Sequence, residues 1–246
     1  KLAKYDLDLK WQSFEGYFQE LKKRGTALNL ISQVGHGLLR KSVMGDAPRQ
    51  PTSKELCKMK QLLVAALENG AWGLSTGLIY PPSSYADTEE LIELAQVVAE
   101  YNGIYSTHLR DEGNELIKAV KEAIKIGQKA GASVEISHHK AIGKKNWGKV
   151  DKTLELIAQA KQSGIDINCD MYPYLATSTG LAALLPARVK KGGKKKVLER
   201  LKKQEFRTEI KEYWQQERQT KEAWNKILVS EVSNENNSCL EGKSIA

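Results

Sequence analysis

One pattern, a helix followed by a glycine and a short apolar strand, recurs along this chain. Gly25, Gly70, Gly103, Gly131 and Gly164 each end a segment with helical spacing of apolar residues and precede one with the composition of a strand. The last four glycines are 33, 28 and 33 residues apart, which is the length of one βα unit. Because such units join parallel strands by right-handed crossovers, the sequence predicts an α/β fold with a parallel sheet.

Polar residues stand at the predicted strand ends. The five strands expected at about 27–34, 71–76, 104–108, 132–137 and 165–170 are followed by or end in His36, Ser75-Thr76, Thr107-His108, Ser137-His138 and Cys169-Asp170. A barrel gathers such residues on its C-terminal face, whereas an open sheet concentrates them at one switch point. The distribution favours a barrel. A sixth strand is expected at 226–232, so about six of the eight strands needed for closure are expected here.

Helices are expected between these strands. They are predicted at about 9–24, from the capping box Thr52–Glu55 to Leu67, after Asp87 to Tyr101, and at about 114–131 and 151–164. Beyond Pro186 the pattern changes to Lys-rich helix, at about 195–214 and on to 224, followed by a turn at 233–238. We expect residues 1–246 to be the central part of one barrel domain, with a helical insertion at about 187–225.

Composition excludes several classes of protein. The net charge of +8 is concentrated in lysine clusters without an aromatic ladder, so we expect a solvated surface and no nucleic-acid partner. Apolar runs of about 18 residues are absent, so no membrane partner is expected. The cysteines are Cys57, Cys169 and Cys239, without a Cys-x-x-Cys pair, which favours a reduced, cytoplasmic setting.

His108 and His138 are the candidates for chemistry. Each ends a predicted strand, and neighbouring parallel strands would bring both to one crevice. Neutral imidazole is a common zinc ligand, but a catalytic zinc takes about three protein ligands. A third would come from Asp170, Cys169, His36 or a residue outside the chain. The alternative is that the two histidines are hydrogen-bonded strand-end residues, and their spacing alone leaves both readings open.

Neighbouring polar residues have weaker signals. If the strand continues past His138, His139 points to the opposite side and is structural, whereas Lys140 returns to the side of His138 and faces a substrate carboxylate or solvent. The charges of Arg110, Asp111 and Glu112 pair with one another or with a substrate. Loop hydroxyls that could reach the same crevice are those of Tyr80, Tyr172, Tyr174 and Ser178.

Several motifs occur together in one order. They are Gly73-Leu-Ser-Thr-Gly-Leu-Ile-Tyr80-Pro-Pro, Tyr85-Ala-Asp-Thr-Glu-Glu90, Thr107-His-Leu-Arg-Asp-Glu-Gly113, Ile136-Ser-His-His-Lys140, Asn146-Trp-Gly148, Asp170-Met-Tyr-Pro-Tyr174 and Ser178-Thr-Gly180. With them the chain resembles the N-acyl-D-amino-acid deacylases (D-aminoacylases) of the amidohydrolase superfamily. The resemblance runs from Val34 to Pro186 and returns weakly at 240–244.

The resemblance implies a (β/α)8 TIM-type metal-dependent hydrolase barrel that hydrolyses the amide of N-acyl-D-amino acids. By resemblance, His108 and His138 are zinc ligands, and Lys140 receives the α-carboxylate of the substrate. Tyr80, Tyr172 and Ser178 match further substrate-binding positions. Arg110 and His36 are weaker site candidates, and His36 lies in a family stretch without an assigned role.

The chain also departs from the family pattern. An early His-x-His pair, the cysteine ligand after it and a late proton-shuttling aspartate have no counterpart between Lys1 and Ala246. We therefore expect no catalytic residue in this chain, no small β domain, and one or two zinc ions in the intact enzyme, with zinc binding and activity of this chain alone left open. A homo-oligomer is an open expectation. The alternatives are a cyclic amidohydrolase of the hydantoinase or dihydroorotase kind and a metal-free, inert fragment.

Overall fold

The computed structural model describes residues 11–217, 221–232 and 234–246. The described chain divides into two compact units, a larger one of residues 11–183 with 191–193 and a smaller one of residues 184–190 with 194–246. The prediction of one barrel domain across residues 1–246 stays a prediction. The ends of the first five predicted strands, with the polar residues at those ends, belong to the larger unit.

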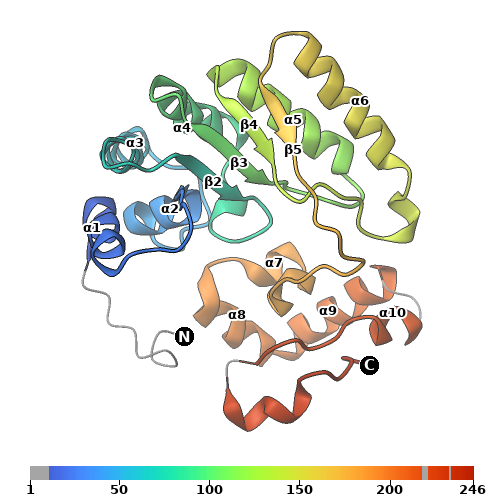
Figure 1. Ribbon diagram of the computed structural model, residues 1–246. Coiled ribbons are helices and arrows are strands. Elements are labelled where there is room, and N and C mark those ends of the chain that lie inside the picture. Colours follow the sequence, from blue (N-terminus) through green and yellow to red (C-terminus); the bar gives the residue numbers. More distant parts are fainter. Residues whose placement is uncertain (1–10, 218–220, 233) are drawn as a thin grey trace. The chain divides into compact units, whose positions relative to one another are not determined.

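A parallel five-stranded sheet forms the centre of the larger unit (Figure 1). Its strands are β1 (Val34–Gly35), β2 (Gly73–Gly77), β3 (Ile104–His108), β4 (Ser133–Ile136) and β5 (Ile167–Cys169). They follow one another in the order β1-β2-β3-β4-β5, and every neighbouring pair is parallel. An unbroken order is that of a barrel wall, since a doubly wound sheet reverses its order at a switch point. The predicted α/β class is confirmed.

Helices fill each crossover between strands. They are α2 (His36–Met44) and α3 (Ser53–Glu68) before β2, α4 (Thr88–Glu100) before β3, α5 (Leu116–Ala130) before β4 and α6 (Lys149–Gln162) before β5, with α1 (Phe14–Arg24) ahead of β1. The predicted capping box is present, because Thr52 and Glu55 exchange hydrogen bonds at the start of α3. Asp87 caps α4 by accepting from the Glu90 amide. These caps fix where each crossover turns back toward the sheet.

The two faces of the sheet differ in burial. On β3 the side chains of Tyr105 and Thr107 are buried, and Ile104, Ser106 and His108 on the alternate face are half-buried. The buried face packs against the helices in one continuous apolar core that includes Leu74, Leu91, Ile126 and Val134. His108 therefore lies at the end of β3 on the face that the core does not cover.

The strand predicted at 27–34 is wrong except for its last residue. Only Val34 and Gly35 pair with β2, and His36 begins helix α2 instead of ending a strand. Leu28 and Ile31 are 80% and 66% exposed, so their apolar side chains do not mark a buried strand. The predicted helix start at Leu9 lies outside the described residues, and the described helix begins at Phe14 after the cap Ser13.

The sixth predicted strand, at 226–232, is also wrong. Leu228 forms an isolated antiparallel bridge with Ser244, and the sheet has five strands among the described residues. The Lys-rich segment forms four shorter helices: α7 (Ala187–Lys190), α8 (Gly193–Leu201), α9 (Gln204–Glu217) and α10 (Lys221–Asn225). Val189, Phe206 and Ile210 form their small core, and the 3-10 helix η5 (Glu235–Leu240) takes the place of the predicted turn. Among the described residues, no helix has the length and apolar character needed to cross a membrane.

Candidate metal centre

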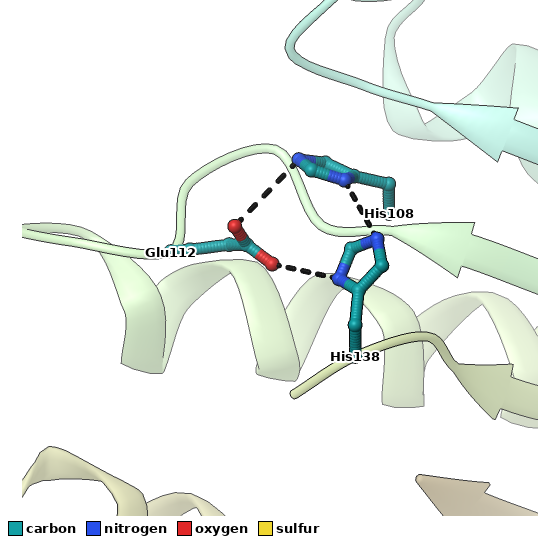
Figure 2. A group of neighbouring side chains, drawn as sticks. All are labelled: His108, Glu112 and His138. Atoms are coloured by element: carbon teal, nitrogen blue, oxygen red, sulfur yellow. Dashed lines mark hydrogen bonds and ion pairs between the residues drawn. The ribbon is translucent and has the colours of Figure 1, made fainter. Parts of the chain in front are cut away.

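Three metal-ligating side chains meet at the ends of β3 and β4. His108 is the last residue of β3, Glu112 follows in the β3–α5 loop, and His138 lies just past β4 (Figure 2). One ligand atom from each residue lies within 4.8 Å of the others. The predicted meeting of His108 and His138 is therefore observed, with a carboxylate beside them.

The two imidazoles face each other directly. The Nδ1 atom of His108 lies 2.9 Å from Nε2 of His138, and the rings cross at 70° with centroids 4.5 Å apart. Glu112 binds the other side of the second ring, with 3.1 Å between its Oε1 and His138 Nδ1. Its other oxygen lies 3.8 Å from His108 Nε2. Figure 2 shows the carboxylate spanning both rings.

Backbone geometry delivers His138 to this position. The amide of Ser137 donates to the Thr107 carbonyl at 3.0 Å, which continues the pairing of β3 with β4. The backbone then turns, because His138 has a φ of 44°, in the left-handed region that side-chain-bearing residues adopt uncommonly. Asp170 holds this turn: its Oδ1 accepts from the His138 amide at 2.6 Å.

The surroundings favour neutral, metal-binding imidazole at His108. Burial lowers the pKa of His108, the charges of His138 and Lys140 lower it further, and the charge of Glu112 opposes this shift. His108 Nε2 is buried and has no hydrogen-bond partner, whereas Nδ1 of the same ring faces His138 Nε2. A neutral histidine binds metal through a ring nitrogen that carries no proton.

These residues fit a zinc ion. Two nitrogen ligands of a tetrahedral zinc are about 3.3 Å apart, from bond lengths of about 2.0–2.1 Å. The observed 2.9 Å between His108 Nδ1 and His138 Nε2 needs only a small opening to reach that separation. Two histidines are also part of known catalytic zinc donor sets. The other ligand candidates take different roles: the Asp170 carboxylate bonds a backbone amide, and burial raises the pKa of the Cys169 thiol.

Lys140 lies beside the cluster. Its Nζ is 2.6 Å from Glu112 Oε1, 2.7 Å from the His138 carbonyl oxygen and 3.0 Å from His138 Nδ1. It also lies 5.4 Å from the centre of the Tyr172 ring. Lys140 lies on the same side as His138, as predicted, but not because a strand continues past His138. Strand β4 ends at Ile136, and the left-handed turn at His138 determines where the Lys140 side chain lies.

Two of the three residues predicted to offer hydroxyls to a substrate, Tyr80 and Tyr172, lie next to the same histidines. The Tyr80 ring is 5.3 Å from the His108 ring, and its hydroxyl lies 2.8 Å from Thr179 Oγ1. The Tyr172 ring is 6.4 Å from the His138 ring. Its buried hydroxyl has no hydrogen-bond partner. Ser178 is exposed, and its neighbour Thr179, which sequence reasoning did not single out, is the residue that contacts Tyr80.

Arg110 and His36 lie in other networks. Arg110 donates two hydrogen bonds to Glu122 on α5, at 2.9 and 3.0 Å, so the predicted mutual pairing of Arg110 with Asp111 and Glu112 is wrong. Asp111 instead accepts from the amides of Gly113 and Glu115. The partner of Arg110 could not be predicted from the sequence, because Glu122 lies beyond the β3–α5 loop and about two turns into α5.

His36 is buried at the start of α2. Its Nδ1 lies 3.0 Å from Ser83 Oγ, and its Nε2 lies 2.9 Å from Glu90 Oε1. Arg40 also pairs with the buried Glu90.

His139, predicted to be structural, is buried and bonds Thr153 of α6 at 2.9 Å. That prediction is confirmed.

Glu112 is the residue of the cluster that sequence reasoning missed. It stood in a charged triplet, which suggested pairing within the loop. The available signal was its position four residues after His108, near enough to return to the same imidazole. Only the fold shows that it also reaches His138 and Lys140.

Comparisons with known proteins identify relatives of this chain. No protein-family profile matches the chain. A D-aminoacylase of Alcaligenes xylosoxydans xylosoxydans is 41% identical over 172 residues, which is 70% of this chain and 35% of that protein. The chain is homologous to the D-aminoacylases. An N-acyl-D-glutamate deacylase of the same organism is 40% identical over 172 residues, again 70% of this chain and 35% of the relative.

A solved deacylase has a similar fold over part of its length. The crystal structure of an N-acyl-D-glutamate deacylase from Bordetella bronchiseptica, complexed with zinc and a phosphonate inhibitor, superposes with a TM-score of 0.64 at 39% identity. The superposition covers 66% of this chain and 34% of that one. The chain thus spans about a third of the length of the curated D-aminoacylase relatives that it matches.

Proposed function

We propose that this chain contributes half of the metal site of a zinc-dependent N-acyl-D-amino-acid deacylase. The observation that carries the proposal is the 2.9 Å approach of His108 Nδ1 to His138 Nε2 at the ends of adjacent parallel strands. It is supported by relatives about 40% identical that are named D-aminoacylase and N-acyl-D-glutamate deacylase. The reaction would release a carboxylate and a free D-amino acid.

His108 and His138 would hold the zinc through ring nitrogens. When bound, zinc supplies an activated water and polarises the scissile carbonyl. Burial keeps His108 in the neutral form that such binding needs. The backbone turn held by Asp170 keeps His138 aimed at His108. No residue of this chain is assigned to proton transfer.

Lys140 would receive the α-carboxylate of the substrate. Its ammonium already contacts one carboxylate, that of Glu112, and its side chain is about one-fifth exposed. A substrate carboxylate would approach from that open side. An ammonium acts as a compact charge with three donors, so it can contact the substrate and Glu112 together.

Hydroxyl groups would orient the acyl amino acid beside the histidines. Tyr80 and Tyr172 place aromatic rings next to His108 and His138. The buried Tyr172 hydroxyl has an unused hydrogen-bonding capacity, which a substrate oxygen would satisfy. Ser178 would complete this set from the exposed segment after β5. The contacts of Arg110 and His36 support structural roles for these two weaker candidates.

Amine release from N-acyl-D-amino acids by the zinc-loaded full-length protein tests the proposal. The assay compares acetyl derivatives of D-methionine, D-glutamate and D-aspartate with their L-enantiomers, before and after treatment with a chelator. We expect D-specific release that chelation removes and zinc restores. Activity that resists chelation, or no release from any of these compounds, contradicts the proposal. Hydrolysis of a hydantoin in preference to all of them would favour the cyclic alternative.

A further inference from the structure

The Glu112 side chain lies against both histidines of the candidate metal centre and against Lys140. Its side chain is 5% exposed, yet it contacts His138 Nδ1 at 3.1 Å and the Lys140 ammonium at 2.6 Å, and it approaches His108. Its backbone is held as well, because its carbonyl accepts from the Ile142 amide at 2.7 Å. A buried carboxylate with this many donors has a fixed position.

We propose that Glu112 is a positioning residue that accepts a hydrogen bond from the Nδ1–H group of His138, so that Nε2 becomes the metal-binding atom, and that Glu112 does not itself bind the metal. The inference rests on the proposed function, since it concerns the same zinc site. Metal-binding histidines commonly donate their second ring N–H to a carboxylate, which fixes both the tautomer and the ring orientation.

The position of Lys140 decides between an outer and an inner role for Glu112. The ammonium lies within 2.6 Å of Glu112 Oε1 and 3.0 Å of His138 Nδ1, so one cation already lies on this side of the His138 ring. A second cation bound to the same two atoms would be repelled. The opposite side of the ring, where Nε2 faces His108 Nδ1, has no such cation in contact with it among the described residues.

The hydrogen bonds around His138 are consistent with a proton on Nδ1 and none on Nε2. A neutral His138 that binds metal through Nε2 has its single proton on Nδ1. That N–H donates to Glu112. The Lys140 ammonium, although 3.0 Å from the same nitrogen, then donates to Glu112 and to the His138 carbonyl oxygen and not to Nδ1. Glu112 thereby satisfies one buried cation and one ring proton, and His138 Nε2, which faces His108 Nδ1, is left for the metal.

The first test uses the unmodified 246-residue chain without metal. Long-range proton–nitrogen NMR of the imidazoles reports which nitrogen of His138 bears the proton. We expect a protonated Nδ1 and an unprotonated Nε2. A proton on Nε2 of neutral His138 would overturn the inference whether or not the chain binds zinc.

The second test compares Glu112→Gln and Glu112→Asp with the matched control Glu115→Gln, whose side chain is exposed three residues further along the loop. Zinc affinity is measured by competition with a chromophoric chelator, and the ligand set by the visible spectrum of the cobalt-substituted protein. We expect Glu112→Gln to weaken zinc binding about 10- to 100-fold with an unchanged cobalt spectrum, as for other outer carboxylates. The control should match the unsubstituted chain.

Two results separate failure of this inference from failure of the proposed function. A cobalt spectrum altered by Glu112→Gln shows that Glu112 is a direct ligand, and unchanged zinc affinity shows that it does not position His138. Either result overturns the inference and leaves a zinc site in place. If His138→Ala binds zinc as well as the unsubstituted chain, the proposed function fails instead. The NMR result on the unsubstituted chain stands even if Glu112→Gln does not fold.

Discussion

The carboxylate of Asp170 accepts a hydrogen bond from the His138 backbone amide at 2.6 Å, and this bond ties the end of β5 to the turn that carries the His138 imidazole. The Asp170 carbonyl also accepts from the His139 amide at 2.8 Å. Two contacts from one residue thus hold a left-handed histidine, whose φ is 44°. The position of the His138 ring therefore depends on a residue that does not touch the ring itself.

Replacing Asp170 should loosen this turn. We expect Asp170→Ala to lower the free energy of unfolding by about 1 kcal/mol, because the amide loses a charged acceptor at a partly solvated position. Zinc affinity should fall in parallel, because His138 is no longer held toward His108. Urea unfolding and zinc titration measure the two effects. Asp170→Asn keeps an acceptor oxygen and should lose less of both; equal losses in the two variants would contradict the hydrogen-bond explanation.

Breaking the buried network of His36, Arg40 and Glu90 should strongly destabilise the larger unit. Glu90 is almost fully buried between a guanidinium and an imidazole, so Glu90→Gln leaves Arg40 as an uncompensated buried charge. We expect a loss of about 3–5 kcal/mol in the free energy of unfolding. Urea denaturation measures this loss.

Glu93→Gln is the matched control for Glu90→Gln. Glu93 lies about one turn further along α4, and its substitution breaks a solvent-exposed ion pair with Lys60. Such an exposed pair contributes about 0–1 kcal/mol. Similar losses for the two variants would show that burial of the Glu90 network has no special effect. Zinc affinity should stay unchanged in Glu93→Gln.

Tyr105 predicts a dependence of stability on pH. Burial raises its pKa to about 12, against an ordinary value of 10.0. The folded protein thus favours the neutral phenol. The stability it contributes is complete below pH 10 and is lost as the pH rises from 10 toward 12, where the unfolded chain ionises first. A shift of this size corresponds to about 2–3 kcal/mol.

The matched variant for this effect is Tyr105→Phe. Its unfolding free energy should fall less steeply above pH 10 than that of the unsubstituted chain, since the phenol is the group removed. Urea unfolding at pH 8, 10 and 11 gives the difference in unfolding free energy between the two proteins. The titration of other residues affects both proteins alike and cancels in this difference. Parallel pH profiles would contradict a raised pKa at Tyr105. Loss of the 3.3 Å contact with Thr76 should lower stability equally at every pH.

Local patterns in the sequence predict much of this fold. The capping box of Thr52 and Glu55 fixes the start of α3, and the glycine-spaced βα units place His108 and His138 at the ends of adjacent strands. Apolar spacing alone fails where nothing distinguishes a buried strand from an exposed segment. This is why only Val34 of the strand expected at 27–34 is in a strand, and why the one expected at 226–232 is reduced to a single bridge.

Long-range pairing explains what the sequence does not predict about the site. Glu112 reaches His138 and Lys140 only because the loops after β3 and β4 lie side by side, and Arg110 turns instead to Glu122 on the following helix. Charges adjacent in sequence therefore have separate partners. The choice depends on loop conformations, for which residue type gives little information.

Zinc titration of the 246-residue chain and of its His108→Ala, His138→Ala and His139→Ala variants tests the central claim most directly. His139 is the matched control, because it is adjacent to His138 and bonds Thr153 instead of facing His108. We predict stoichiometric zinc in the unsubstituted chain and in His139→Ala, and losses in the other two variants greater than the roughly 10- to 100-fold effect of an outer residue. Zinc affinity that is the same in all four proteins would contradict a metal site at His108 and His138.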